Sequence, residues 1–464
     1  MAEGPGKGSP ELKGTFRLMT MKRTEDTVDP GGAGADNKPR FLTGWEFLFH
    51  RFSFILGCFK YLLNRRDYPL FRAGYWNGGY LRTLVIQRKL GMLKLIEFNG
   101  SYYSTLAVPH FPSKAFDEAV ARGGLNFAAA GTPLKPRCDY VILGITPRCP
   151  HRCSHCYEYH NLGEEEIIPL ARWQEVLREL QDIGVSTIVL SGGEPMMRFD
   201  ELLKLLESGD KNRSDFHLHT SGSGITPERA RELKKAGLTS AAVGLDDVVP
   251  ERHDRLRGNG TFANAVDALR IFNQAGIFTY VNLCVTGDLI RSGDLFRYMD
   301  FVRSLNVGLV ELLEPRPVGS FAKSGDSILL SEADRRVLAE FVRTFNTGRA
   351  YRGYPLIYYV ADMESPGNLG CLMGGLSHFS VDSRGNVTPC VFMPVSFGSI
   401  REESLRAIFT RMREHIPIPV RTECPSLRIR QFMESSGSGT PIPVPFEKIR
   451  TVWKEMLYNG SQGM

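Results

Sequence analysis

The sequence predicts an α/β protein built around a partial (β/α)6 barrel. From Asp139 onward, short apolar stretches alternate with amphipathic helical patterns, an order typical of a parallel sheet with crossover helices. Six such repeats are enough for an open, partial barrel. Polar residues follow several strand ends, where parallel sheets collect ligands. We expect the strands near Tyr140–Ile145, Thr187–Leu190, Phe216–His219, Ser240–Leu245, Thr279–Val285 and Gly308–Leu313.

Length and composition describe a globular protein of several units. The chain has 464 residues, of which 42% are hydrophobic and 23% charged. Its nine cysteines are an odd number spread over a long chain, which favours a reducing cytoplasm over a disulfide-stapled secreted fold. A net charge of +6 is modest for this length, and we expect no nucleic-acid partner.

The chain divides into five predicted parts. Residues 1–40 are rich in Gly, Pro, Lys and Asp without an apolar run, so we expect a disordered tail. Residues 41–138 form an aromatic, basic and α-rich extension, and residues 139–330 form the barrel. A small cysteine-bearing extension follows at 331–434, and 435–464 hold a linker and a last helix.

The aromatic segment after Gly44 has one apolar helical face. That face is formed by Trp45, Leu48, Phe52, Ile55, Phe59 and Leu62. Its longest uncharged run, from Phe52 to Phe59, is far shorter than the roughly 20 residues that cross a bilayer. Two interpretations stay open: a helix packed on the barrel, which we expect, or one lying in a membrane interface.

Three cysteines fall within eight residues directly after the first predicted strand. Cys149, Cys153 and Cys156 form a loop that can direct several soft ligands at one centre. Thiolates favour iron–sulfur clusters or zinc. With the nearby His151, His155 and His160, the same loop can also build a closed zinc site, so the loop alone leaves both open.

A glycine-rich turn follows the second predicted strand and reads Ser191-Gly192-Gly193-Glu194-Pro195. Glycines allow a close approach of the backbone to a ligand, and a carboxylate favours an ammonium group. The third strand ends in Thr220-Ser221-Gly222, which is either a polar turn or a second set of ligand contacts.

The cysteine spacing, with Tyr157 directly after it, resembles the cluster loop of the radical S-adenosylmethionine (SAM) superfamily, and the Gly-Gly-Glu-Pro turn agrees. The resemblance implies a TIM-like partial barrel in which three cysteines hold a 4Fe-4S cluster and leave one iron open for SAM. It assigns SAM contacts to Tyr157, Gly192, Gly193, Glu194, Pro195, Thr220, Ser221 and Asp246.

The fourth strand end departs from the family pattern. Val243 to Asp247, followed by His253 to Gly258, is similar to the Ser-Leu-Asp-Gly and His-Asp-x-x-Arg-Gly pair of members that carry a SPASM extension. Gly244 stands where the family has serine, and Asp247 where it has glycine. The contact of that serine to SAM must therefore be missing or supplied elsewhere. Asp246 remains a candidate ribose or substrate contact.

A second cysteine group lies in the C-terminal extension. Cys371 is followed by Cys390, which has Gly385 five positions before it, and this resembles the opening of a SPASM or shorter Twitch extension. Only Cys424 follows, so the resemblance implies one auxiliary iron–sulfur cluster whose fourth position is open or not a cysteine. The alternative is three structural thiols. We interpret Cys58, Cys138 and Cys284 as isolated core or surface residues.

The resemblance predicts an enzyme that cleaves SAM reductively to a 5′-deoxyadenosyl radical, which abstracts hydrogen from an unactivated C–H bond. An electron donor such as flavodoxin or ferredoxin is implied. The aromatic, basic N-terminal part favours a hydrophobic or membrane-derived substrate, while the SPASM resemblance leaves peptide modification as the alternative. A non-enzymatic electron carrier fits the Gly-Gly-Glu-Pro turn least. We expect a cytoplasmic protein, with contact to the inner face of the membrane left open.

Overall fold

The structure is a computed structural model that describes residues 37–52, 85–122, 138–435 and 442–458. The tail expected at 1–40 and the linker expected after residue 435 fall largely outside these ranges, and Cys58 falls outside them entirely.

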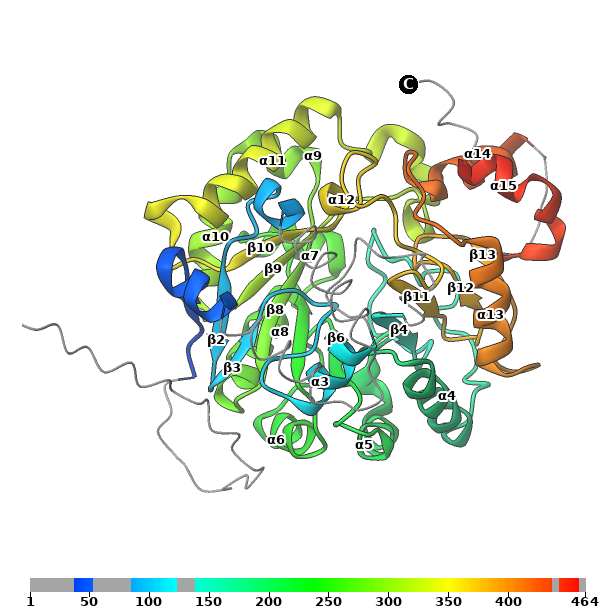
Figure 1. Ribbon diagram of the computed structural model, residues 1–464, viewed down its shortest axis with the longest axis horizontal. Helices are drawn as coiled ribbons and strands as arrows, with labels where there is room; N and C mark the ends of the chain where they lie inside the picture. Colours follow the sequence, from blue (N-terminus) through cyan, green and yellow to red (C-terminus); the bar gives the residue numbers. More distant parts are fainter. Residues whose placement is uncertain (1–36, 53–84, 123–137, 436–441, 459–464) are drawn as a thin grey trace, which may run out of the picture. The chain divides into compact units, whose positions relative to one another are not determined.

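The barrel sheet is parallel from β10 to β11, and its strands lie close to the predicted positions. The predicted six are β4 (Tyr140–Gly144), β5 (Thr187–Ser191), β6 (Asp215–Thr220), β7 (Ser240–Gly244), β8 (Phe278–Cys284) and β9 (Leu309–Leu313). They pair in chain order with parallel register, and Figure 1 shows the strands running side by side through the molecule. The α/β fold class predicted from the alternating pattern is confirmed.

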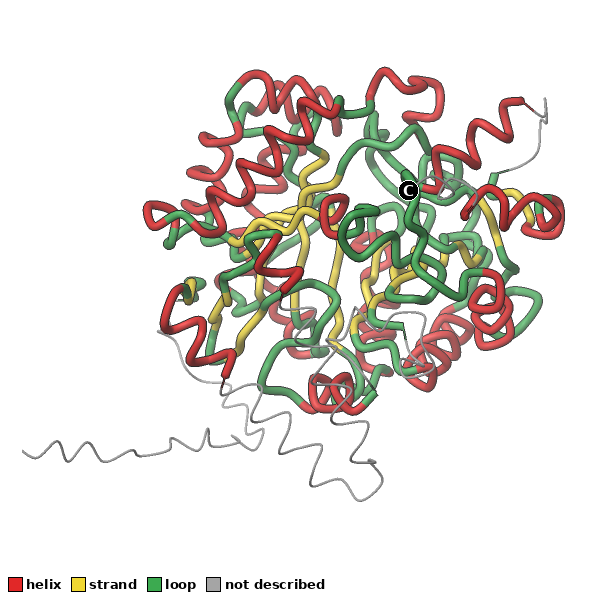
Figure 2. The backbone as a smooth tube through the Cα atoms, turned by 45° about the horizontal axis from the view of Figure 1, so that its top comes forward, coloured by secondary structure: helices red, strands yellow, loops and turns green. Residues whose placement is uncertain are grey.

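Helices connect these strands and cover the outer side of the sheet, as Figure 2 shows. They are α4 (Leu170–Ile183), α5 (Phe199–Ser208), α6 (Pro227–Lys235), α7 (Pro250–Arg257), α8 (Thr261–Gln274), α9 (Gly287–Ser292), α10 (Leu295–Ser304) and α11 (Glu332–Thr347). The predicted periodicity holds in α4, whose buried face includes Trp173, Val176 and Leu180. Helix α11 begins with a capping box between Ser331 and Asp334.

The sheet continues past residue 330, where the expected barrel ended. Strand β10 (Leu356–Tyr359) pairs in parallel with β9 at one end of the sheet. At the other end, β11 (His378–Val381) pairs in parallel with β4 and forms a hairpin with β12 (Val387–Thr388). The extension therefore contributes a hairpin whose first strand is hydrogen-bonded to the barrel. Short helix α12 (Val360–Met363) follows β10 directly.

The described part of the N-terminal extension contains a small sheet besides its helices. Strands β1 (Arg40–Leu42), β2 (Leu95–Phe98) and β3 (Ser101–Tyr103) pair antiparallel. Asn99 and Gly100 both have positive φ, as the tight turn of a two-residue hairpin requires. Ser113 is the N-cap residue of helix α3 (Lys114–Ala121), and its hydroxyl accepts a hydrogen bond from the Phe116 backbone amide.

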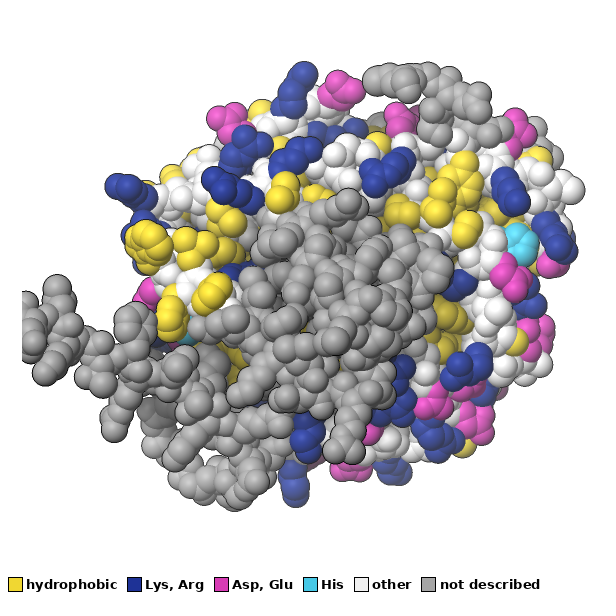
Figure 3. Space-filling view, viewed as in Figure 1, with side chains coloured by type: hydrophobic (Ala, Val, Ile, Leu, Met, Phe, Trp, Pro, Cys, Tyr) yellow, Lys and Arg dark blue, Asp and Glu magenta, His cyan; other side chains and the backbone are white. Residues whose placement is uncertain are grey.

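Residues 44–52 are helical, but the predicted apolar face is not buried. Trp45 is 85% exposed, and Leu48, Phe49 and Phe52 are also exposed, while Phe47 packs inward under Arg51. Hydrophobic side chains are visible over this helix at the left of Figure 3. The expected packing of this face on the barrel is therefore wrong for the residues described. No helix in the described ranges combines the length and hydropathy that a bilayer crossing requires.

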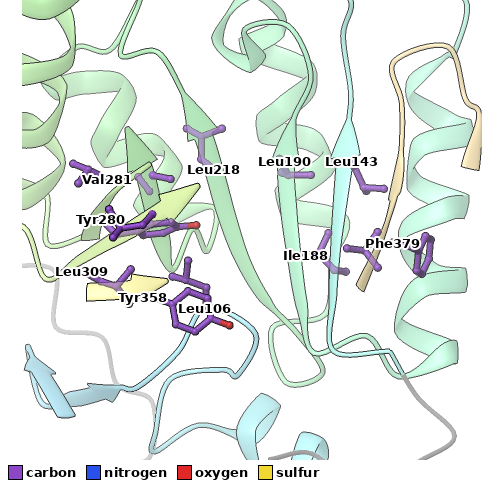
Figure 4. Packing of buried hydrophobic residues seen from close by; sticks show 14 of the residues in the cluster. Leu106, Leu143, Ile188, Leu190, Leu218, Tyr280, Val281, Leu309, Tyr358 and Phe379 are labelled. Atoms are coloured by element: carbon purple, nitrogen blue, oxygen red, sulfur yellow. The ribbon is translucent and has the colours of Figure 1, made fainter. Parts of the chain in front are cut away.

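The core lies on both faces of the parallel sheet. Leu143 and Leu190 are register partners on β4 and β5, and Figure 4 shows them next to Phe379 of β11. Tyr280 and Tyr358 lie at the other end of the same view. All five side chains are buried. The apolar runs predicted as strands are thus covered on both sides.

The C-terminal part packs as a smaller unit around aromatic rings. It contains β13 (Val395–Ser396), α13 (Leu405–His415), α14 (Pro425–Ser435), β14 (Val444–Pro445) and α15 (Arg450–Tyr458). Phe397 stacks on Phe446 with ring centroids 4.3 Å apart, and Trp453 is fully buried beside both. This packing places Cys424 immediately before α14.

Candidate active site

The loop that carries Cys149, Cys153 and Cys156 follows β4 and is held by backbone hydrogen bonds from other segments. The Ser154 amide donates to the Leu256 carbonyl over 2.8 Å, and the Ser320 amide donates to the Cys156 carbonyl over 2.9 Å. All three cysteines are free and partly buried. The loop is thus anchored to α7 and to the segment after β9, so the thiols stay at the carboxyl ends of the strands.

Burial raises the pKa of each thiol, to about 11 for Cys149 and about 12 for Cys156. A metal centre must therefore displace protons as it binds. Among the described residues, no three His, Cys, Asp or Glu side chains converge on one point suited to a single ion. In an iron–sulfur cluster each ligand binds its own iron, so the thiols of a cluster need not converge on a single point.

The Gly-Gly-Glu-Pro turn packs directly against the cysteine loop. A Cβ on Gly192 would lie 2.5 Å from the Thr146 carbonyl oxygen, and one on Gly193 would lie 2.3 Å from that of Arg148. The Gly193 amide donates to the Thr146 carbonyl over 2.7 Å. Glycine is required at both positions because the loop backbone occupies the space of a side chain.

Glu194 does not face the cavity; its carboxylate joins two strand ends. Oε1 accepts a hydrogen bond from Thr220 Oγ1 (2.7 Å), and Oε2 accepts from the Ser221 backbone (2.8 Å) and from Ser221 Oγ (2.5 Å). Burial raises the pKa of Glu194, and the Ser221 hydrogen bonds oppose that rise. The carboxylate therefore positions the ends of β5 and β6, and the backbone of Gly192 and Gly193 is left to meet a ligand.

The structure at the end of β7 shows why residue 244 is a glycine and not the serine of the family pattern. A Cβ on Gly244 would lie 2.3 Å from Arg257 Nη1, so the guanidinium of Arg257 occupies the place of a side chain. Arg257 Nε donates to Asp246 Oδ2 over 2.5 Å, and His155 Nε2 is 3.2 Å from the same oxygen. Although burial alone would raise it, Arg257 and His155 hold the pKa of Asp246 well below its usual range.

A cavity of about 180 Å³ lies between these segments. Of the sequence-predicted site residues it is lined by Cys149, Cys153, Cys156, Tyr157, Gly192, Gly193, Thr220 and Ser221. Glu194, Pro195 and Asp246 stand behind this wall. Arg257 contributes a buried cation where Asp246 was expected to make contact. The glycine cradle and the three thiols around one cavity fit a cluster with a small polar ligand.

The cavity also has a polar wall that the sequence analysis missed. His219 Nε2 is 2.9 Å from Tyr280 Oη, and Asn282 Nδ2 is 3.5 Å from His219 Nδ1. Asn282 Oδ1 is buried without a hydrogen-bond partner among the described residues. The signal was present in the sequence, because Asp215, His217 and His219 alternate along one strand and so share a face.

Cys284 and Arg316 were missed as well. Cys284 ends β8 and lines the cavity, so the interpretation as an isolated core or surface residue is wrong for it. Cys138 is fully buried, as expected for a core residue. Arg316, two residues after Glu314, lines the same cavity, and its guanidinium donates a hydrogen bond to Glu314 Oε2 over 3.0 Å.

A larger cavity of about 300 Å³ adjoins the first, since Tyr157, Val318 and Phe392 line both. Its wall combines the end of the cysteine loop, the segment after β9 and the hairpin of the extension. It contains the carboxylates of Glu158 and Asp382 as well as apolar side chains.

The three cysteines of the extension come together from separate segments. Cys371 forms a two-way backbone bridge with Val420, whose segment leads to Cys424 four residues later. Burial first, and then the neighbouring Glu364, Cys424 and Cys390, raise the pKa of the Cys371 thiol. Burial raises the pKa of the Cys390 thiol to about 12. Three soft donors thus share one buried place beside β12.

Comparisons with known proteins agree with this geometry. Residues 143–291 match the radical SAM superfamily, and residues 371–425 match SPASM, an iron–sulfur cluster-binding domain. A PqqA peptide cyclase from Streptomyces rochei is 28% identical over 254 residues, covering 54% of this chain and 68% of the relative. An AdoMet-dependent heme synthase from Oleidesulfovibrio alaskensis is 24% identical over 310 residues, covering 62% and 79% respectively.

The fold has a counterpart among solved structures. SuiB from Streptococcus suis, bound to its precursor peptide SuiA, aligns with a TM-score of 0.50 at 16% identity, covering 76% of this chain and 80% of SuiB. At this identity the likeness speaks for the fold alone, and it confirms the predicted partial barrel. The chain therefore contains a radical SAM domain and a SPASM domain, and it is an enzyme whose cofactors are SAM, a four-iron cluster and an iron–sulfur cluster in the SPASM domain.

Proposed function

We propose that the chain modifies a peptide or protein substrate by removing hydrogen from an unactivated C–H bond. When bound, SAM and the four-iron cluster supply the hydrogen-abstracting radical. The observation that carries this proposal is the larger cavity beside the cofactor cavity. Its wall contains Glu158, Asp382 and Arg430 among apolar groups, which suits a peptide segment better than a uniformly apolar chain.

The relatives support the same choice. One relative is named a peptide cyclase, and the SuiB structure is named as a complex with its precursor peptide. They support peptide modification better than the hydrophobic substrate favoured by the N-terminal sequence.

Residues of this chain have separable tasks in the proposed reaction. We assign the cluster to Cys149, Cys153 and Cys156, and the amino group of SAM to the backbone of Gly192 and Gly193. Arg257 offers its guanidinium to a carboxylate. His219 and Asn282 present fixed polar atoms to whatever group enters from the larger cavity. An external one-electron donor such as flavodoxin or ferredoxin completes the requirements.

Isotope transfer tests the substrate class. Reconstituted protein is incubated anaerobically with SAM and dithionite, and with either a peptide pool from deuterated protein or vesicles of deuterated phospholipid. Deuterium in 5′-deoxyadenosine from the peptide pool is expected. Deuterium from the lipid alone would contradict the proposal.

A cavity-filling variant adds a structural control. Ala322 lines the larger cavity but not the smaller one, so Ala322→Trp should keep SAM cleavage and lose deuterium transfer. Val337→Trp, on an exposed position of α11, should keep both.

A second candidate is a membrane-derived apolar substrate. The exposed Trp45, Leu48, Phe49 and Phe52 on one short helix are the specific observation in its favour. Flotation with anionic vesicles tests it, comparing the full chain with Trp45→Ser/Phe49→Ser. Equal flotation of both would remove the reason for this candidate.

A further inference from the structure

One buried acid of the barrel sheet has no task in the site described so far. Glu311 lies in the middle of β9 and is 7% exposed. Among the described residues, none donates a hydrogen bond to its carboxyl group or pairs with it as a cation. Buried carboxyl groups normally have such partners. Of the two arginines that line the cofactor cavity, Arg257 pairs with Asp246. The other, Arg316, pairs with Glu314.

The strand pattern directs Glu311 into the barrel. Side chains two positions apart on a strand share a face. Leu313 lines the cofactor cavity, so Glu311 lies on the same inner face, two positions deeper in the barrel. Its register partner on β8 is Asn282, which also lines that cavity, and its register partner on β10 is Tyr358. Three polar side chains on neighbouring strands therefore form one row across the inside of the sheet.

This row presents oxygen atoms that the described residues do not satisfy. Asn282 Oδ1 is buried and accepts no hydrogen bond from any of them. Neighbouring strands lie about 4.8 Å apart, so Asn282 and Glu311 begin close enough together to hold one group between them. A primary ammonium has three donors and no acceptor, and its charge balances that of a carboxylate. The hydroxyl oxygen of Tyr358 is the third acceptor of the row.

The surroundings keep the row uncharged until a cation arrives. Burial raises the pKa of Glu311 from 4.5 to about 8, so its carboxyl group is protonated at pH 7. Five titratable groups face the barrel interior around it: Tyr140 of β4, His217 and His219 of β6, Tyr280 of β8 and Tyr358 of β10. Burial is the main cause that raises the pKa of each tyrosine well above 10. Burial also lowers the pKa of His217 to about 4 and that of His219 to about 3, so all five are neutral at pH 7.

We propose that Glu311 and Asn282 bind a primary ammonium group of the substrate, carried on an alkyl arm that enters from the cofactor cavity. The row lies two residues below the cavity wall, about 7 Å along the strand, a depth that the four-carbon stem of a lysine spans. Leu313 is an apolar neighbour for that stem. Binding transfers the Glu311 proton to solvent and leaves a carboxylate beside the ammonium. The inference rests on the proposed function, because it names the part of the peptide that reaches into the barrel.

Calorimetry with n-butylammonium chloride tests the site without a peptide. The reconstituted full chain with SAM is titrated at pH 7 in phosphate and in Tris, whose different heats of ionisation report released protons. We expect butylammonium to bind with release of about one proton, and 1-butanol to bind at least about tenfold more weakly. Glu311→Gln should bind butylammonium about tenfold more weakly than the parent and release no proton. Glu175→Gln, at an exposed position of α4, should behave like the parent.

Three results would overturn the inference. They are no butylammonium binding by the parent chain, binding of 1-butanol as tight as that of butylammonium, and unchanged butylammonium binding in Glu311→Gln. The glutamine keeps both the shape and the uncharged state of the buried side chain, so this variant should fold like the parent, and circular dichroism checks that it does.

A modified peptide pool separates this inference from the proposed function. The deuterated pool is used untreated, acetylated at its α-amines, or acetylated at all amines. We expect deuterium transfer from the first two pools and none from the third, which identifies a lysine side chain. Loss already in the second pool would support the site with an α-amine as its ligand, and transfer from all three would overturn it. If the untreated pool gives no transfer, the proposed function fails, while the butylammonium titration still decides the role of Glu311.

Discussion

The barrel loop brings Cys149, Cys153 and Cys156 together within eight residues, whereas the extension gathers Cys371, Cys390 and Cys424 from three separate segments. The first group borders a cavity with a glycine cradle, a buried arginine and a polar wall. In the second group, a backbone bridge joins Cys371 to Val420, four residues before Cys424. The cysteine site that borders the ligand cavity is thus encoded locally, whereas the cysteine site of the extension depends on long-range packing.

Removing cysteines should separate the two sites most strongly. Cys153→Ala should reduce 5′-deoxyadenosine formation to the protein-free background and lower iron by about four per chain. Cys371→Ala/Cys390→Ala should also lose about four irons but keep SAM cleavage, because the cofactor cavity is untouched. Iron counts and chromatography of the anaerobic reaction measure both, and Cys138→Ala is the matched thiol control. Loss of SAM cleavage in the extension variant would show that the two sites are not independent.

The glycine cradle should be nearly as sensitive as the thiols. In Gly193→Ala the new Cβ meets the Arg148 carbonyl at 2.3 Å, so the cysteine loop must move. We expect SAM binding to weaken by about 1 to 3 kcal/mol, measured by calorimetry on the reconstituted protein. In Gly367→Ala the new Cβ would have no neighbouring atom within 4 Å, so this variant should bind SAM like the parent chain. Unchanged binding in Gly193→Ala would mean that the turn does not fix the loop.

A buried acid joins the two regions and should make their contact pH-dependent. Glu158, just after the cysteine loop, accepts a hydrogen bond from Ser383 of the extension hairpin. Burial and then Asp382 raise the pKa of Glu158 from 4.5 to about 7. The folded state therefore holds the Glu158 proton more tightly than the unfolded state does. The contribution of this proton to the free energy of unfolding is complete below pH 4.5 and is lost as the pH rises to 7.

Substitution of this acid should flatten that pH dependence. Between pH 5 and 8, Glu158→Gln should lose less unfolding free energy than the parent, by on the order of 1 to 3 kcal/mol. Urea unfolding at the two pH values measures this, and their difference cancels the fixed cost of altered hydrogen bonds. Glu175→Gln, at an exposed position of α4, is the control. Identical pH dependence of Glu158→Gln and parent would remove the acid from this role.

The smallest effect is expected where the chain departs from its family. Gly244→Ser places a side chain against the Arg257 guanidinium, the mobile end of a long side chain, which can shift. We expect SAM affinity to fall about fivefold, roughly 1 kcal/mol, as the pair with Asp246 is disturbed. Tighter binding would instead show that serine restores the family contact without help from Arg257.

Much of the fold was accessible from the sequence because its signals are local. The six predicted strands rest on short apolar runs between helical patterns, and the structure contains all six. Strands β10 and β11 were not assigned to the barrel. Their pairing with β9 and β4 joins residues far apart in the chain, and no local pattern encodes it.

The resemblance to the superfamily, the cysteine loop and the Gly-Gly-Glu-Pro turn can all be derived from the amino-acid sequence, because thiol spacing and backbone freedom are properties of neighbouring residues. The contacts of Glu194 with Thr220 and Ser221, and the guanidinium of Arg257 in the space beside Gly244, appear only in the folded chain. Each of these contacts joins segments that packing alone brings together, and burial gives them their strength by excluding water from the charges.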